Sequence, residues 1–260
     1  MRHRPDKKLV GSRFGRALHT YRRSALVQHH MAGELLAMIE RAGMADHVER
    51  VLEFGCGSAI LTSLLLRRFS VGTYFANDLV EESRDFVSDA LSGRTVGEMV
   101  FLQGDFECLE PLPVNLDLVV SNATVQWFHD LPGFFSRMAD SIRPGGLLVF
   151  STFSTGNMKE IAQLGEASLS YLTLQEIADL AGERFEPVGI GEEERRQEFA
   201  SPEAMLRHIR DTGVNGLSRQ AWTRTRYHEF MQRYRSSFSS GSGVYLTYHP
   251  VYCCFRRKGA

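Results

Sequence analysis

Short apolar runs alternate with segments of helical spacing over residues 51–153, and this alternation restricts the fold more than any other feature of the chain. Runs of about four to eight apolar residues predict buried strands, whereas apolar residues that recur every three or four positions predict amphipathic helices. Strands that alternate with helices pair as a mainly parallel sheet with helices on both faces. The expected strands are residues 51–54, 72–78, 99–105, 116–122 and 146–152, and the expected helices are residues 60–66, 81–91 and 132–142.

The flanking segments complete this α/β pattern. Thr173 and Glu176 have the spacing of a capping box, which predicts the start of a further helix. Ser201-Pro202 predicts the start of an arginine-rich helical segment. We expect an N-terminal helix over residues 12–43, a helix over 174–181, a charged edge strand over 185–199, helices over 202–235, a loop over 236–243 and a last strand over 244–255.

These elements predict a seven-stranded, mainly parallel sheet with an N-terminal helix and a helical insertion before the last strand. The insertion is rich in arginine and lies where a lid over a site, or a surface for a partner, is expected. The predicted parts are an N-terminal helical cap (1–46), a cofactor-binding core (47–199), the basic insertion (200–243) and the last strand of the core (244–260).

A tight glycine turn follows the first expected strand and predicts a cofactor site. Gly55 and Gly57 let the backbone approach a ligand at the carboxyl edge of the sheet, and Asp78, at the end of the next strand, is placed to accept two ribose hydroxyls. The run has no third glycine where a dinucleotide fingerprint needs one, and Glu53 would sit badly beside a pyrophosphate. An acid there suits the ammonium of S-adenosylmethionine. The pattern therefore favours that cofactor.

Composition limits the cellular setting. The chain has 260 residues and lacks any apolar run of the roughly 18 residues that a membrane span requires. Its charged first residues are not followed by the apolar stretch of a signal peptide, so we expect a cytoplasmic protein. The four cysteines (Cys56, Cys108, Cys253 and Cys254) lack metal-binding or disulfide-scaffold spacing, and we expect all of them to be buried free thiols.

Charge is distributed unevenly although the net charge is only -1. Residues 1–23 carry eight Lys or Arg against one acid, and residues 195–260 carry twelve against four, so the stretch between them is strongly acidic. Basic ends of this kind can form a shared face for an acidic partner. They can equally neutralise the acidic middle of the same chain, and charge alone does not separate these two interpretations.

The order of motifs resembles that of the class I S-adenosylmethionine-dependent methyltransferases, a Rossmann-like fold. Further motifs are similar to those of the malonyl-acyl carrier protein methyltransferases of biotin synthesis, and the resemblance covers nearly the whole chain, most weakly over 157–198. One departure is Ala59, where many relatives carry a third glycine, and we expect its methyl group to narrow the cofactor site slightly. The more specific motifs are Phe14-Gly15-Arg16-Ala17 with Tyr21, Ser121 to Trp127, Phe199 to Gly216, and Tyr245 to His249.

The resemblance assigns site residues by position. Asp78 and Asp105 have the alternative of being ordinary strand-end acids, Trp127 that of packing in the core, and His249 that of a strand histidine with satisfied hydrogen bonds. The residues implied to contact the cofactor are Glu53, Gly55, Cys56, Gly57, Asp78, Leu79, Asp105, Phe106 and Asn122. Tyr21 and Trp127 are implied as walls of the catalytic site, and Arg207, Arg210, Arg219, Arg224, Arg226 and His249 as contacts of the substrate or its carrier.

The implied reaction is methylation of the free carboxylate of malonyl-acyl carrier protein, or of malonyl-coenzyme A, to the methyl ester that enters pimelate and biotin synthesis, with S-adenosylhomocysteine as the other product. An acidic carrier protein would meet the basic insertion, while the aromatic interleaving of a single-strand nucleic-acid binder is missing. The histidines lack metal-ligand spacing, so we expect no metal. A methyltransferase of another small acid or of RNA, and a cofactor-binding protein without turnover, stay open as alternatives.

Overall fold

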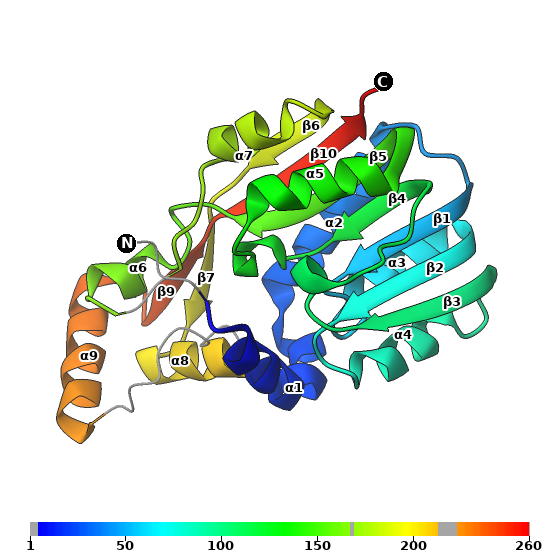
Figure 1. Cartoon of the computed structure of the whole chain (residues 1–260). Coiled ribbons are helices and arrows are strands. Elements are labelled where there is room, and N and C mark those ends of the chain that lie inside the picture. Colours follow the sequence, from blue (N-terminus) through cyan, green and yellow to red (C-terminus); the bar gives the residue numbers. More distant parts are fainter. Residues whose placement is uncertain (1–4, 167–168, 213–222, 260) are drawn as a thin grey trace.

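The computed structural model describes residues 5–166, 169–212 and 223–259. Its centre is a seven-stranded sheet in the order β3-β2-β1-β4-β5-β10-β6, which confirms the predicted strand count (Figure 1). β10 runs antiparallel to both of its neighbours, whereas β1 to β5 pair in parallel. The strands are β1 (His47–Phe54), β2 (Ser70–Asp78), β3 (Val96–Gln103), β4 (Leu116–Ser121), β5 (Ile142–Phe153), β6 (Phe185–Glu192) and β10 (Pro250–Arg257).

Helices cover both faces of this sheet, as the alternation predicted (Figure 1). Because successive side chains of a strand point to opposite faces, neighbouring residues enter different cores. Val51 packs in the cluster that includes α2 and α3, and Leu52 packs in the cluster that includes α5 and α7. The covering helices are α2 (Leu26–Arg41), α3 (Ile60–Arg68), α4 (Ser83–Leu91), α5 (Leu131–Ser141) and α7 (Leu174–Ala181), and the predicted capping box of α7 is present.

The single helix predicted over residues 12–43 is wrong, because two helices form there. α1 (Lys7–Ser24) ends at Ala25, whose ψ of 54° is not helical and whose N–H donates to the carbonyl of Tyr21. The break contains neither glycine nor proline, so local sequence gives no signal for it. α2 packs on the sheet, while α1 turns away and crosses the carboxyl ends of the strands (Figure 1).

The strands predicted over 185–199 and 244–255 are each divided in two. β6 is followed by β7 (Arg195–Phe199), and β9 (Gly243–Tyr248) is followed by β10. β7, β9 and β8 (Ser239–Ser240) form a separate three-stranded sheet that was not predicted. The paired strands leave the main sheet together, since the N–H of Glu193 donates to the carbonyl of Pro250 at 3.1 Å.

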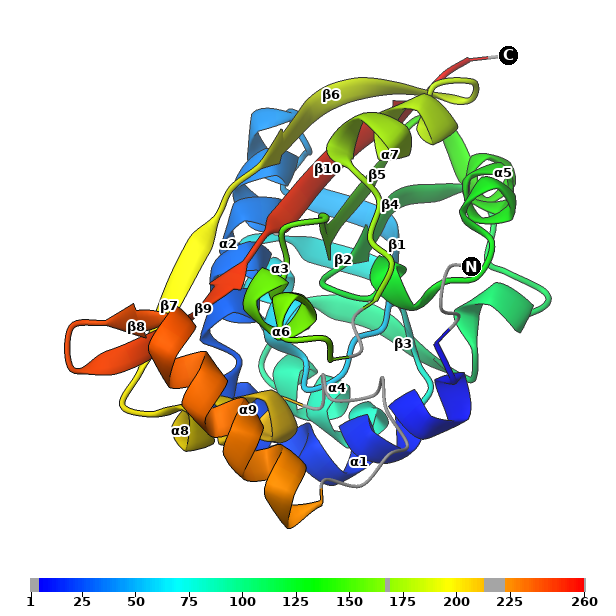
Figure 2. The ribbon, with the colours of Figure 1, turned by 90° about the vertical axis from the view of Figure 1, so that its left-hand side faces the viewer.

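The helical part of the insertion lies beside α1. α8 (Pro202–Asp211) contacts α1, and the hydroxyl of Thr20 donates to the carbonyl of Asp211 at 3.1 Å. α9 (Arg224–Ser237) packs on α8 and extends into the segment predicted as a loop. α1, α8 and α9 thus form one helical layer at the end of the main sheet (Figure 2). Short helices α6 (Lys159–Gln163), η1 (Phe106–Cys108) and η2 (Val125–Trp127) complete the described elements.

Candidate functional site

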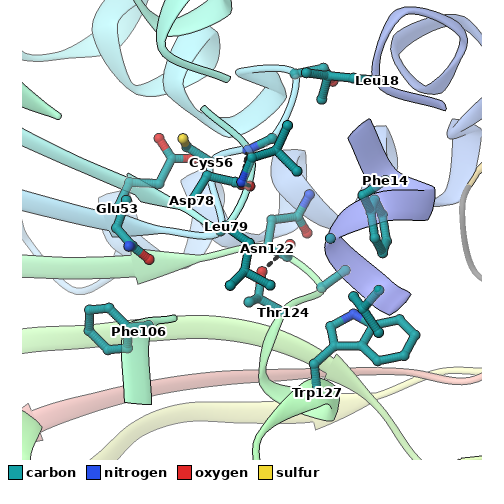
Figure 3. A pocket seen from close by; sticks show the side chains of 18 of the residues that line it. Phe14, Leu18, Glu53, Cys56, Asp78, Leu79, Phe106, Asn122, Thr124 and Trp127 are labelled. Carbon is teal, nitrogen blue, oxygen red and sulfur yellow. Dashed lines mark hydrogen bonds between the residues drawn. The ribbon is translucent and has the colours of Figure 1, made fainter. Parts of the chain in front are cut away.

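A pocket lies between α1 and the carboxyl ends of β1, β2 and β4 (Figure 3). It encloses about 950 Å³, part of which is open to solvent. This is the edge at which parallel α/β sheets bind ligands. Every residue assigned by position to the cofactor or to the catalytic walls lines it: Tyr21, Glu53, Gly55, Cys56, Gly57, Asp78, Leu79, Asp105, Phe106, Asn122 and Trp127.

The turn after β1 is built on two glycines with left-handed backbone conformations. Gly55 has a φ of +66°, and a Cβ atom there would lie 2.1 Å from the hydroxyl of Thr124, so no side chain fits. Gly57 has a φ of +48° and open space where a side chain would stand. The bare backbone of Gly57 therefore leaves room for a ligand to approach closely.

Ala59 affects the conformation of the backbone and not, as expected, the space for a ligand. It is fully buried and is not among the residues that line the pocket, so the predicted narrowing by its methyl group is wrong. Its φ of +58° is one that glycine adopts without strain and that costs alanine about 1–2 kcal/mol. The consequence of the missing third glycine is local backbone strain at the start of α3.

Backbone amides fix the carboxylate of Asp78 at the pocket wall. The N–H of Gly57 donates to Oδ2 at 2.8 Å, and the N–H of Val80 donates to Oδ1 at 2.9 Å. Burial raises the pKa of Asp78, and these two hydrogen bonds act against that rise. Each carboxylate oxygen has a second lone pair, so Asp78 keeps the capacity to accept hydroxyl groups of a ligand.

Glu53 is a buried acid at the other side of the glycine turn. Thr62 donates to its Oε2 at 2.6 Å, and Tyr74 donates to the same oxygen. Burial raises the pKa of Glu53 to about 7, although the hydrogen bonds from Thr62 and Tyr74 lower it. Its second oxygen, Oε1, belongs to a carboxylate that lines the pocket. A cation placed next to this oxygen would stabilise the ionised carboxylate.

The pocket also fits a ligand that carries both polar and apolar groups. The hydroxyl of Ser58 is buried in the wall and has no hydrogen-bond partner among the described residues, so a polar ligand atom would satisfy it. On the α1 side, the rings of Phe14 and Trp127 lie edge to face with centroids 6.0 Å apart (Figure 3). The ring centroid of Tyr21 lies 5.8 Å from that of Phe14. Phe14, Tyr21 and Trp127 together form an aromatic wall of the pocket.

Lys7 is a pocket residue that sequence reasoning missed. Its ammonium group donates to both carboxylate oxygens of Asp105, at 2.7 and 2.8 Å, and also binds Glu107. The contact ties the first turn of α1 to the segment after β3. Nothing local signals it, because the partners are 98 and 100 residues apart in the chain. The carboxylate of Asp105 therefore has a partner within the protein, besides lining the pocket.

Comparisons with known proteins agree with this geometry. A family model described as a methyltransferase domain matches residues 52–150. A malonyl-[acyl-carrier protein] O-methyltransferase from Prosthecochloris aestuarii is 50% identical over 252 residues, which cover 97% of this chain and 94% of that relative. The chain belongs to the malonyl-[acyl-carrier protein] O-methyltransferase family. The predicted family resemblance is confirmed.

Solved structures place this malonyl-[acyl-carrier protein] O-methyltransferase family member in the Rossmann-like methyltransferase fold. The YcgJ protein from Bacillus subtilis has a TM-score of 0.62 at 13% identity and covers 89% of this chain and all of its own. The N-methyltransferase NodS from Bradyrhizobium japonicum, in complex with S-adenosylhomocysteine, has a TM-score of 0.50 at 13% identity, over 88% of this chain and 86% of its own. Such low identities show the fold alone.

Four of the five arginines predicted to contact a substrate or carrier can be placed, and none of these four lines the pocket. Arg207 and Arg210 are exposed on α8, next to α1, and Arg224 is exposed at the start of α9. Arg226 binds Glu166 at 2.7 Å. Arg219 lies outside the described residues. These positions suit surface contacts and not the chemistry itself.

His249 lies between β9 and β10 and lines none of the pockets around the strand ends. Its Nδ1 accepts a hydrogen bond from the N–H of Gly156 at 3.2 Å, and its Nε2 lies 3.2 Å from Glu192. The structure thus favours the alternative reading, a histidine whose ring nitrogens both have partners in the fold.

The remaining expectations concern cysteines, metals and membranes. All four cysteines are free, but the predicted burial of Cys108 is wrong, because it is exposed. Within the described ranges, no three His, Cys, Asp or Glu side chains are grouped so as to hold a metal ion. Among the helices described, none combines the length and the apolar character needed to cross a membrane.

Proposed function

We propose that this protein transfers a methyl group from S-adenosylmethionine to the free carboxylate of a malonyl group carried by acyl carrier protein. The observation that carries the substrate assignment is the 50% identity with a malonyl-[acyl-carrier protein] O-methyltransferase over nearly the whole chain. The pocket supports the cofactor assignment, because it offers a buried acid, a fixed strand-end carboxylate and an aromatic wall around a glycine turn.

Each group of the pocket has a part in the proposed cofactor complex. Glu53 faces the methionyl ammonium, since it lines the pocket and its raised pKa shows a carboxylate that a neighbouring cation would stabilise. Asp78 accepts the ribose hydroxyls. Leu79 and Phe106 contact the adenine, and Asn122 lies beneath the methionine portion.

The proposed chemistry requires no acid or base from the protein. S-adenosylmethionine, when bound, supplies an electrophilic methyl group on a positively charged sulfonium. A malonyl carboxylate is ionised near neutral pH, so its oxygen forms the new O–C bond directly while the C–S bond breaks. The negative and positive charges cancel, and no proton is transferred.

The chain therefore contributes alignment and exclusion of water. Tyr21, Phe14 and Trp127 form an aromatic wall that keeps water from the reacting atoms and attracts a sulfonium to its ring faces. Lys7 fixes the first turn of α1 and so keeps this wall in place. Correct alignment of oxygen, carbon and sulfur contributes several kcal/mol to the rate, as it does for oriented reactants in general.

A basic surface beside the pocket is the proposed docking site for the carrier. Arg207 and Arg210 on α8 are exposed, and Arg16 and Arg23 on the neighbouring α1 are exposed as well. Acyl carrier proteins are acidic, so such a surface raises the association rate in a way that salt weakens.

The test is direct. The protein is incubated with S-adenosylmethionine and malonyl-acyl carrier protein, and mass spectrometry follows the carrier. We expect the carrier to gain the mass of one methyl group, and acetyl-acyl carrier protein, which has no free carboxylate, to stay unchanged. Methylation of RNA or of a different small acid in place of the carrier would contradict the proposal, and so would cofactor binding without any turnover.

A further inference from the structure

A narrow cavity adjoins the cofactor pocket along the aromatic wall. It shares Phe14, Tyr21 and Trp127 with that pocket, and it continues to Gln28 at the start of α2 and to Tyr171 in the segment before α7. The two spaces therefore share the aromatic wall, of which Figure 3 labels Phe14 and Trp127. The cavity as it stands has room for about one water molecule, so a carboxylate enters only if the lining side chains move apart slightly, and a nucleobase does not fit.

Unused hydrogen-bond donors line this cavity. Within the described part of the chain, neither the hydroxyl of Tyr21 nor the indole N–H of Trp127 has a hydrogen-bond partner. The side-chain amide of Gln28 also lacks a hydrogen-bond partner among the described residues, although Gln28 is only 3% exposed. Because buried polar groups in folded proteins are almost always paired, unpaired donors around one cavity indicate a ligand that accepts hydrogen bonds.

Tyr171 adds a further donor. Its hydroxyl accepts a hydrogen bond from Nδ2 of Asn157 at 2.8 Å, which leaves its own proton free to donate. Burial raises the pKa of Tyr171 to about 12 and raises that of Tyr21 as well. Both phenols are therefore protonated near neutral pH and act as donors.

Charged side chains are missing from the lining of the cavity, as far as the structure describes the chain. Lys7 reaches only the cofactor pocket and is bound there by Asp105 and Glu107. An anion in the cavity would thus be held by neutral donors alone. Neutral donors compensate for the loss of water around a carboxylate without neutralising it, so its oxygen stays nucleophilic.

Building on the proposed function, we infer that this cavity receives the terminal carboxylate of the acyl substrate, and that Tyr21, Gln28 and Tyr171 hold it by uncharged hydrogen bonds. No arginine clamp is needed. The countercharge for the buried carboxylate is the sulfonium in the adjoining pocket. The site therefore selects substrates with a free carboxylate next to the transferable methyl group.

Access from outside passes Tyr171 and Asn157. Both residues also line an open groove on the surface, together with Thr155, Lys159 and Ser170. The groove and the cavity thus meet at the Asn157–Tyr171 hydrogen bond. Opening of that bond would admit the acyl group from the surface, and its closing would hold the carboxylate in place.

The inference is tested with Tyr171→Phe and Gln28→Leu, and Tyr252→Phe serves as the matched control. Tyr252 also carries a buried phenol, but its hydroxyl donates to Glu193 at 2.7 Å, away from both cavities. We expect kcat/KM for malonyl-acyl carrier protein to fall roughly ten- to hundredfold in the first two variants, as for a lost hydrogen bond to a charged group. We expect the Kd of S-adenosylmethionine to change less than about twofold, and the control to match the unmodified protein.

Gln28→Leu separates a binding role from a structural one. It removes an amide for which the described residues offer no hydrogen-bond partner, so the melting temperature should stay the same or rise while kcat/KM falls. Unchanged kcat/KM in both Tyr171→Phe and Gln28→Leu would overturn the inference, and so would an equal loss of cofactor affinity. Failure of the unmodified protein to methylate malonyl-acyl carrier protein is a distinct result, because it contradicts the proposed function and not the role of the cavity.

Discussion

Cofactor binding should release a proton from Glu53. In the free protein, burial raises the pKa of this carboxyl to about 7, so it is half protonated at pH 7. The ammonium of S-adenosylmethionine, placed against Oε1, favours the ionised form and returns the pKa to about 4.5 or below. Binding is therefore accompanied by loss of about 0.5 proton at pH 7 and about 0.9 proton at pH 6.

The sign and size of the pH dependence follow from the same numbers. A group that loses its proton on binding makes the affinity rise with pH. Between pH 6 and pH 7, the protonated fraction of the free carboxyl falls from about nine-tenths to one-half, which tightens the Kd of the cofactor about fivefold. This range lies below the pKa of about 7.7–8.0 of an α-ammonium, so the ammonium of the cofactor stays mostly protonated in it.

Calorimetry measures the proton directly. Titrations at pH 6 and pH 7 in two buffers of different ionisation enthalpy give the number of protons released per cofactor bound. Glu53→Gln is the matched variant, because glutamine keeps the shape and the acceptor oxygen but has no proton to lose. We expect its binding to be weaker and its heat to be nearly independent of the buffer. Equal proton release by Glu53→Gln and the unmodified protein would refute the assignment of Glu53 to the ammonium.

Three further predictions follow from contacts of the site. Gly55→Ala puts a Cβ atom 2.1 Å from the hydroxyl of Thr124 and should lower the free energy of unfolding in urea by about 2–4 kcal/mol, and an unfolding midpoint like that of the unmodified protein would contradict the close approach. Lys7→Met removes the tie to the segment after β3, so amide hydrogen exchange in the first turns of α1 should accelerate and the KM of the cofactor should rise several-fold; unchanged exchange would count against that tie. Arg207→Glu combined with Arg210→Glu should raise the KM of the carrier about tenfold or more at low salt and leave the Kd of the cofactor unchanged, whereas equal affinity for the carrier would remove the docking argument.

The proposed cofactor half of the site could be predicted because its signals are local. Gly55 and Gly57 follow a strand directly, and Asp78 ends the next strand, so the parallel pairing of β1 and β2 brings them together without knowledge of the rest of the fold. The alternation of strands and helices similarly specified the five parallel strands of the main sheet. These patterns depend on neighbours in sequence or on adjacent strands.

Other features depend on contacts between distant segments. The ion pairs of Lys7 join residues about one hundred positions apart. The division of the last strands results from two segments, at Glu193 and Pro250, that leave the main sheet side by side. Each segment alone reads as one continuous strand, so the second sheet has no signal in either of them. The point at which each strand ends is set by its pairing with the other segment.

The wrongly predicted helix over residues 12–43 is the most informative of these differences. Its helical pattern is continuous, yet the chain breaks at Ala25, which lies between Tyr21 and Gln28. An unbroken helix would place both residues on one straight helix along the sheet. The break instead lets α1 cross the strand ends, so that Tyr21 and Gln28, from two differently directed helices, line the same cavity. A departure from local helical preference is therefore expected at the point where the fold builds the proposed carboxylate site.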